Sequence, residues 1–185
     1  MVLFGGSNAG DSIFYNDVWE YDGVRWTPRT TVNAPSPRNG AVMAFDPGRG
    51  RMILFGGYQL AGAFPIFYDD TWEFDGLTWV RLTPSTRPVS RETATFAYHR
   101  GRGRLLLFGG GRAAGSVVLN DLWEWTGTDW QYVNAISPPL ARWLHSMVYD
   151  SGRDKLVIYG GLGYGTDLND TWEYSAATQT WSNVT

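Results

Sequence analysis

The residues in this chain that could do chemistry are mostly carboxylates and arginines that recur at fixed spacing. Four glutamates each follow a tryptophan, at Glu20, Glu73, Glu124 and Glu173. Three arginines recur with a similar period, at Arg38, Arg91 and Arg142. An acid and a base in one protein suggest proton-transfer catalysis, but a catalytic group is needed only once. We therefore expect these residues to form ion pairs between repeated units or hydrogen bonds to turns, and we assign no catalytic residue.

Other polar residues give equally little support for a reaction centre. A recurring aspartate series is expected to hold loop backbone N–H groups, at Asp17, Asp70, Asp121 and Asp170. The two histidines, His99 and His145, occupy different places in their units, and the chain has no cysteine. We predict no metal site and no cofactor. Turns at 48–51 and 101–104 are rich in Arg and Gly, but they open no helix and are not expected to bind phosphate.

Composition narrows the class of protein further. The chain has 185 residues with 43% hydrophobic and 16% aromatic content, which is enough for one compact domain. Its net charge is −3, with arginines and acids interspersed, so we expect no nucleic-acid partner. Its apolar runs are too short to span a bilayer. Many glycines and prolines, without helical spacing of apolar residues, predict an all-β fold.

The strands that position these residues belong to a repeated unit. The segment FGG occurs at 4–6, 55–57 and 108–110, and YGG follows at 159–161. Within one unit we predict strands at 41–45, 52–55, 70–74 and 77–82, the last two joined by an Asp-Gly hairpin turn. The first unit has no copy of the first strand. The sequence therefore predicts three strands and then three sets of four.

Tryptophans and glycines mark the same positions in every unit. We expect the tryptophans of strands three and four to fill the space between neighbouring sheets, together with Trp125. These repeated tryptophans are Trp19, Trp72, Trp123, Trp172, Trp26, Trp79, Trp130 and Trp181. The second glycines of the doublets, Gly57, Gly110 and Gly161, are expected where the backbone passes close to another segment.

This combination of a glycine doublet, an aromatic third strand and a fourth-strand tryptophan resembles the kelch repeat. The closest likeness is to bacterial-type kelch arrays in the galactose oxidase/kelch-like superfamily. The resemblance implies a β-propeller, here with about three and three-quarter four-stranded antiparallel blades. The blades are expected at 1–30, 35–83, 87–134 and 138–185 of a single array. His145 matches a family histidine that Ala41 and Ala94 replace, and the copper site of galactose oxidase cannot be carried over without cysteine.

Propellers generally close with roughly four to eight blades. We expect an incomplete ring or a piece of a longer propeller. Self-association of two chains into one ring and a strained four-bladed monomer remain alternatives. Because exported arrays of this kind are common, a location outside the cytoplasm is favoured.

Unrepeated residues give the candidate binding face. The loop after each glycine doublet varies in length, and the residue after each repeated arginine varies in type. By the resemblance, one face would carry Asn39, Tyr58, Glu92, Arg112, Trp143 and Tyr164. Our first hypothesis is a non-catalytic scaffold that binds a protein or peptide, with Arg112 facing acidic groups. The alternative is a carbohydrate-binding or carbohydrate-active propeller, like sialic-acid mutarotases, in which Trp143 stacks on a sugar. We identify no acid that occurs in one unit alone and could serve as the catalytic group of that alternative. Trp143 could also simply cap the channel.

Overall fold

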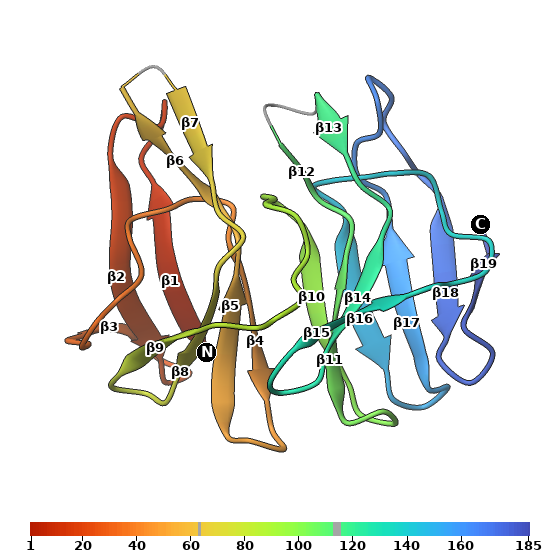
Figure 1. Cartoon of the computed structure of the whole chain (residues 1–185), viewed down its shortest axis with the longest axis horizontal. Helices are drawn as coiled ribbons and strands as arrows, with labels where there is room; N and C mark the ends of the chain where they lie inside the picture. Colours follow the sequence, from red (N-terminus) through yellow and green to blue (C-terminus); the bar gives the residue numbers. More distant parts are fainter. Residues whose placement is uncertain (63, 113–115) are drawn as a thin grey trace.

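The computed structural model describes residues 1–62, 64–112 and 116–185, and the backbone of these residues forms strands and turns without a helix. One three-stranded and three four-stranded antiparallel sheets follow one another across the molecule (Figure 1). We call these sheets blades 1 to 4 in chain order. The prediction of an all-β kelch-type fold with three strands followed by three sets of four is confirmed.

The strands of each blade are adjacent in the sequence. Blade 1 contains β1 (Val2–Ser7), β2 (Phe14–Tyr21) and β3 (Trp26–Arg29). Blade 2 contains β4 (Val42–Asp46), β5 (Arg51–Phe55), β8 (Thr71–Phe74) and β9 (Trp79–Leu82). Blade 3 contains β10 (Thr95–His99), β11 (Arg104–Phe108), β14 (Leu122–Trp125) and β15 (Trp130–Val133). Blade 4 contains β16 (Ser146–Asp150), β17 (Lys155–Tyr159), β18 (Thr171–Ser175) and β19 (Thr180–Asn183).

Two further hairpins, which the sequence analysis treated as loops, rise from the ends of blades 2 and 3. They are β6 (Tyr58–Ala61) with β7 (Phe64–Phe67), and β12 (Gly111–Arg112) with β13 (Val117–Val118). Both hairpins lie at the top of the view in Figure 1. They lie in the loops that follow the glycine doublets of blades 2 and 3.

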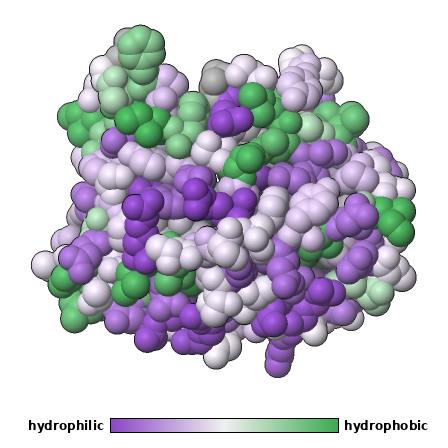
Figure 2. Space-filling model, viewed as in Figure 1, coloured by the Kyte–Doolittle hydropathy of each residue, from purple (hydrophilic) through white to green (hydrophobic). Residues whose placement is uncertain are grey.

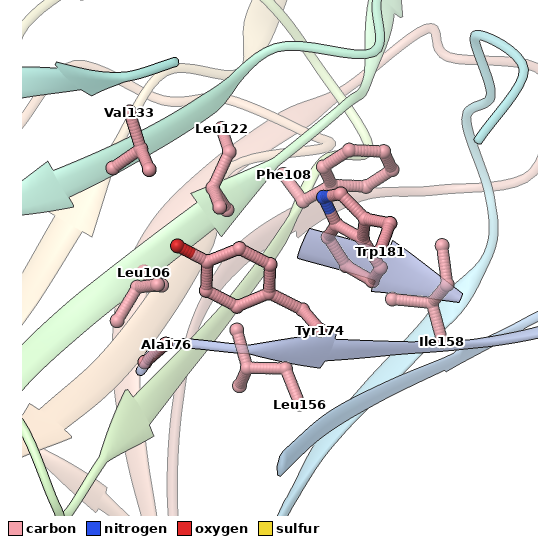
Figure 3. Close-up of a cluster of buried hydrophobic side chains, with 9 residues drawn as sticks. All are labelled: Leu106, Phe108, Leu122, Val133, Leu156, Ile158, Tyr174, Ala176 and Trp181. Carbon is pink, nitrogen blue, oxygen red and sulfur yellow. The ribbon is translucent and has the colours of Figure 1, made fainter. Parts of the chain in front are cut away.

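Apolar side chains fill the space between successive blades. Between blades 3 and 4, Leu106 and Phe108 of β11 face Tyr174 and Trp181 of blade 4 (Figure 3). Leu106, Phe108 and Tyr174 are fully buried. Equivalent clusters lie between blades 2 and 3 and between blades 1 and 2. Each blade therefore needs a neighbour on its apolar faces, since a lone sheet would expose them to water.

The fourth-strand tryptophans explain how the blades hold together. Trp79, Trp130 and Trp181 are each at most 2% exposed. Each ring packs on a phenylalanine of the preceding blade, at centroid distances of 5.0 to 5.1 Å. The prediction of burial is wrong for Trp26, which is 42% exposed. In the described residues no blade covers that face of blade 1, and Trp26 contacts Tyr21 of its own blade instead.

The third-strand tryptophans are only half-buried, because their indole edge reaches a polar partner. The Nε1–H of Trp72 donates to Asp70 at 2.7 Å, and Trp19, Trp123 and Trp172 make the same bond to their own aspartates. The aspartate series was expected to hold loop N–H groups. It accepts from indoles instead, and in blades 2 to 4 from arginine as well.

The repeated arginines form ion pairs within a blade, and not between blades as we expected. Arg91 is 1% exposed and donates from both terminal nitrogens to the two oxygens of Asp121, at 2.6 and 2.7 Å. Its Nη1 also donates to the carbonyl of Gly109. Arg38 and Arg142 make the same contacts with Asp70 and Asp170. Arg142 lowers the pKa of Asp170 to about 2.

The repeated glutamates also pair inside their own blades, with turn or strand arginines. Glu73 pairs with Arg49, and Glu124 pairs with Arg102. Glu173 and Glu20 pair with Arg153 and Arg29. A structural role for the repeated charges therefore fits the geometry, since every copy is paired within its own sheet.

Glycine is required at the second doublet position in blades 2 to 4. Gly57 has a φ of +92°, and a Cβ there would lie 2.7 Å from the carbonyl oxygen of Asn39 and 2.9 Å from the nitrogen of Ala41. The space is filled by the segment that leads into β4. Gly6 has a similar φ of +109° but no atom within 4 Å of its Cβ position, because blade 1 has no such inner segment.

The described sheets do not close into a ring (Figure 1). Blade 1 therefore exposes Met1, Leu3 and Trp26, and blade 4 exposes Val148 and Tyr159. A hollow of about 500 Å³ lies beside β1 and is lined partly by Val2, Met43 and Phe45. None of the described residues forms a helix that is long and apolar enough to cross a membrane.

Candidate functional site

The loops after the glycine doublets of blades 2 and 3 carry the hairpins β6–β7 and β12–β13, which lie at the top of Figure 1. The residue after each repeated arginine makes a β-bridge to the loop after the glycine doublet of its own blade. Asn39 bridges Tyr58, Glu92 bridges Gly111, and Trp143 bridges Leu162. We call the candidate binding face the rim, defined by Asn39, Tyr58, Glu92, Arg112, Trp143 and Tyr164. The repeated bridge places a different side chain at an equivalent position in each blade.

On blades 1 and 2 the rim contains a hydrogen-bonded polar cluster. The hydroxyl of Tyr58 donates to Asp11, and the hydroxyl of Ser7 donates to the other oxygen of the same carboxylate. The side-chain amide of Asn39 donates to Ser7 at 2.9 Å. The hydrogen bonds from Ser7 and Tyr58 lower the pKa of Asp11. Burial and the bond to Asp11 raise the pKa of Tyr58 to about 12, so it remains a donor.

Glu92 lies beside this cluster and has a very different environment. Its side chain is 7% exposed, and its Oε2 lies 3.4 Å from the position that a Cβ on Gly40 would occupy. Among the described residues no donor is bonded to its carboxylate; burial, and then the charge of Asp11, raise its pKa to about 7. Glu92 is therefore a buried acid that is protonated in a large fraction of molecules near neutral pH.

The remaining candidates are grouped on blades 3 and 4. Trp143 is half-buried and lies 3.6 Å from the Cβ position of Gly111, next to Arg112. Tyr164 is 67% exposed, while its hydroxyl reaches the backbone of Val118 in blade 3. Arg112 is half-buried, and its Nη1 lies 3.4 Å from Ser90. Asn39 and Tyr58 thus lie on blade 2, Glu92 and Arg112 on blade 3, and Trp143 and Tyr164 on blade 4.

Apolar side chains stand above this polar cluster. Leu60, Phe64 and Ile66 of the β6–β7 hairpin are exposed. Figure 2 shows apolar surface along the top of the molecule, where this hairpin projects. The ring of Tyr58 contacts Phe14 and Phe67 at centroid distances of 5.6 and 5.8 Å. The rim therefore combines exposed apolar groups with a recessed acidic group.

The role of Asp11 and the special position of Glu92 were not predicted from the sequence. Glu92 is an unrepeated acid, since Asn39 and Trp143 hold the equivalent places of blades 2 and 4. The available signal was an unrepeated acid directly after a repeated arginine. Asp11 lies in a variable loop, and its contact with blade 2 depends on how the blades pack, which the repeat spacing does not reveal.

The two histidines lie apart and have separate neighbours. The Nε2 of His145 lies 2.7 Å from the hydroxyl of Thr95 in blade 3, and burial lowers its pKa to about 3. The ring of His99 contacts that of Tyr149 in a tilted arrangement at a centroid distance of 4.6 Å. In the ranges that the structure describes, no three His, Cys, Asp or Glu side chains are grouped to hold a metal ion.

Comparison with known proteins agrees with the repeated geometry. Mouse and human multiple epidermal growth factor-like domains protein 8 are each 30% identical to this chain in alignments of 159 residues that cover 80% of the chain. The chain spans only 6% and 5% of the length of these relatives. A putative adagio-like protein 2 from rice is 28% identical over 116 residues, covering 60% of the chain and 18% of that protein.

A family model matches the whole of residues 1–185 and is described as the KLHDC2/KLHL20/DRC7 Kelch-repeats domain. Kelch-repeat domains are typically protein-binding scaffolds. The chain therefore belongs to the kelch-repeat domain family.

Proposed function

We propose that this chain is a non-catalytic recognition domain that binds a protein or peptide segment through the rim. One observation carries the proposal. The repeated arginines are used in ion pairs within their own blades, whereas the unrepeated residues Asn39, Glu92 and Trp143 each bridge a loop that follows a glycine doublet. A constant frame that presents variable side chains is a common design of binding surfaces.

The composition of the rim supports a peptide-like ligand. Exposed Phe64 and Tyr164 can contribute apolar contact area, and half-buried Trp143 can provide an anchor near the middle of the interface. Backbone and side-chain polar groups lie between these aromatics, so an extended segment could satisfy its own hydrogen bonds there.

Selection from a display library of short random peptides tests this proposal. We expect enriched peptides to lose about tenfold or more in affinity when Tyr164 or Trp143 is changed to Ala. The matched control is Tyr132→Ala, which removes an exposed tyrosine from the outer strand β15 and should leave binding unchanged. Failure to enrich any peptide, or equal binding by the Tyr164→Ala variant, would reject the proposal.

A second candidate function follows from Glu92. A buried carboxyl whose pKa is raised to about 7 is suited to proton transfer, as in a carbohydrate-active propeller. The charged neighbour that acts on Glu92 is another acid, Asp11, and not the arginine that a sugar-acid site would use. An NMR assay of anomer exchange on a panel of reducing sugars separates the two functions. Acceleration that is lost in Glu92→Gln would favour the enzyme.

A further inference from the structure

Among the described residues, the Nε–H of Arg112 is buried without an acceptor, and the Glu92 carboxylate lacks a hydrogen-bond donor. Glu92 is more than nine-tenths buried. Its backbone is fixed on both sides, since Glu92 exchanges hydrogen bonds with Gly111 and Thr93 N–H donates to Gly40. The side chain lies over Gly40, where a Cβ would be 3.0 Å from the Cβ of Glu92. Glu92 therefore faces the segment that holds Asn39.

The side-chain donors of the polar cluster beside Glu92 are already engaged. Ser7 and Tyr58 both donate to Asp11, and Asn39 donates to Ser7. The result is two neighbouring carboxylates with unequal support, one with two hydroxyl donors and one without any. An unpaired buried carboxylate costs free energy, which a bound donor carrying positive charge would recover.

The surroundings favour an organic cation with a long apolar stem. The charge that acts on Glu92 is that of the Asp11 carboxylate, and the ring of Tyr58 is flanked by Phe14 and Phe67. Lysine and arginine bury their methylene groups against apolar surface while the charged end makes hydrogen bonds. The nearby hairpin residues Leu60 and Ile66 are exposed and could contact the same partner segment.

We propose that Glu92 and Asp11 form a binding site for a cationic side chain, a lysine or arginine, of the protein partner. This inference rests on the proposed function and specifies the chemistry of the ligand. The cation would donate a hydrogen bond to the Glu92 carboxylate, and the negative charge of Asp11 would attract it. Apolar residues on either side of the cation in the partner segment would contact the hairpin.

Peptides selected on the wild-type chain and on Glu92→Gln test the site, with every peptide acetylated at its amino terminus. We expect wild-type selections to enrich Lys or Arg at one fixed position, and Glu92→Gln selections to lose that preference. Replacing the basic residue by norleucine should weaken wild-type binding about tenfold or more, but should leave binding to Glu92→Gln nearly unchanged. Asp167→Asn removes a charge from an exposed loop of blade 4 and should keep the preference.

A carboxyl NMR titration of Glu92 gives a second readout that does not depend on selection. Binding of the lysine peptide should lower the pKa of Glu92 from about 7, whereas the norleucine peptide should not. If peptides bind the rim without a basic preference, or if both peptides act alike on Glu92, the cation site is wrong and the recognition function stands. If no peptide binds, both proposals fail.

Discussion

Repeated and unrepeated charged residues have opposite roles in this chain. Arg38, Arg91 and Arg142 occupy one position in three blades, and each is buried against an aspartate of its own blade. Glu92 follows one of these arginines in the sequence, and its position holds Asn39 and Trp143 in blades 2 and 4; within residues 1–62, 64–112 and 116–185 its carboxylate has no hydrogen-bond donor. The fixed positions stabilise the frame, while the variable positions are free to differ in chemistry.

The buried arginine pairs should be costly to break. We expect Arg91→Met to reduce the free energy of unfolding by about 3–5 kcal/mol, since it leaves Asp121 partly buried without its cation. Arg29→Met is the matched control, because Arg29 pairs with Glu20 on the exposed surface and should contribute about 1 kcal/mol or less. Urea unfolding of both variants measures the difference, and equal losses would contradict a structural role for the buried pairs.

Glu92 should make stability fall as pH rises. Folding raises the pKa of Glu92 from 4.5 to about 7, so its contribution is full below the unfolded value and is lost as pH passes the folded one. By about pH 8 the free energy of unfolding should have fallen by roughly 3 kcal/mol at most, since one pKa unit corresponds to about 1.4 kcal/mol. Urea unfolding of wild type and Glu92→Gln should therefore agree near about pH 4 and diverge near about pH 8, with the variant more stable. If the difference in unfolding free energy between the two proteins did not change with pH, the raised pKa of Glu92 would be refuted.

At the scale of single elements, the strand pattern was readable from the sequence. Alternating residues placed Asp70, Trp72 and Phe74 on one face, and in the structure Trp72 and Phe74 pair with Leu54 and Met52. The hairpins β6–β7 and β12–β13 were not predicted, because their sequences do not recur and contain no turn motif between alternating strands. The exposure of Trp26 depends on a neighbouring blade, so the repeat position alone could not reveal it.

The fourth-strand tryptophan is buried in blade 2 but exposed in blade 1, and this difference allows a direct test of packing between blades. Trp79→Ala should reduce the free energy of unfolding by about 3–5 kcal/mol, because the cavity lies between two blades that cannot collapse around it. Trp26→Ala removes the same side chain from an exposed site and should cost about 1 kcal/mol or less. Similar losses in chemical unfolding of the two variants would contradict packing between blades as the main source of stability.

At the scale of the whole molecule, the two terminal blades expose faces that correspond to buried ones elsewhere. Tyr159 is exposed on blade 4, whereas Phe108 at the equivalent place in blade 3 is fully buried. The number of blades was predictable from the glycine spacing. The proximity of Asp11 to Glu92 was not predictable, because these residues lie in loops of blades 1 and 3 that come together across blade 2.

This open array should associate with itself in solution. We propose that exposed apolar end faces and the free edge of β1 make sedimentation of this 185-residue chain depend on concentration. Tyr159→Glu should weaken the association, while Tyr132→Glu on the outer strand should not. A monomer at every concentration tested would be inconsistent with this expectation.

The rim as the binding surface is tested most directly by mapping a selected peptide onto the backbone amides by NMR. Our account predicts the largest shift changes at Asn39, Tyr58, Glu92, Gly111 and Trp143, where the variable loops bridge the blades. Changes concentrated instead on the outer strands β3, β9, β15 and β19, or along the edge of β1, would contradict it.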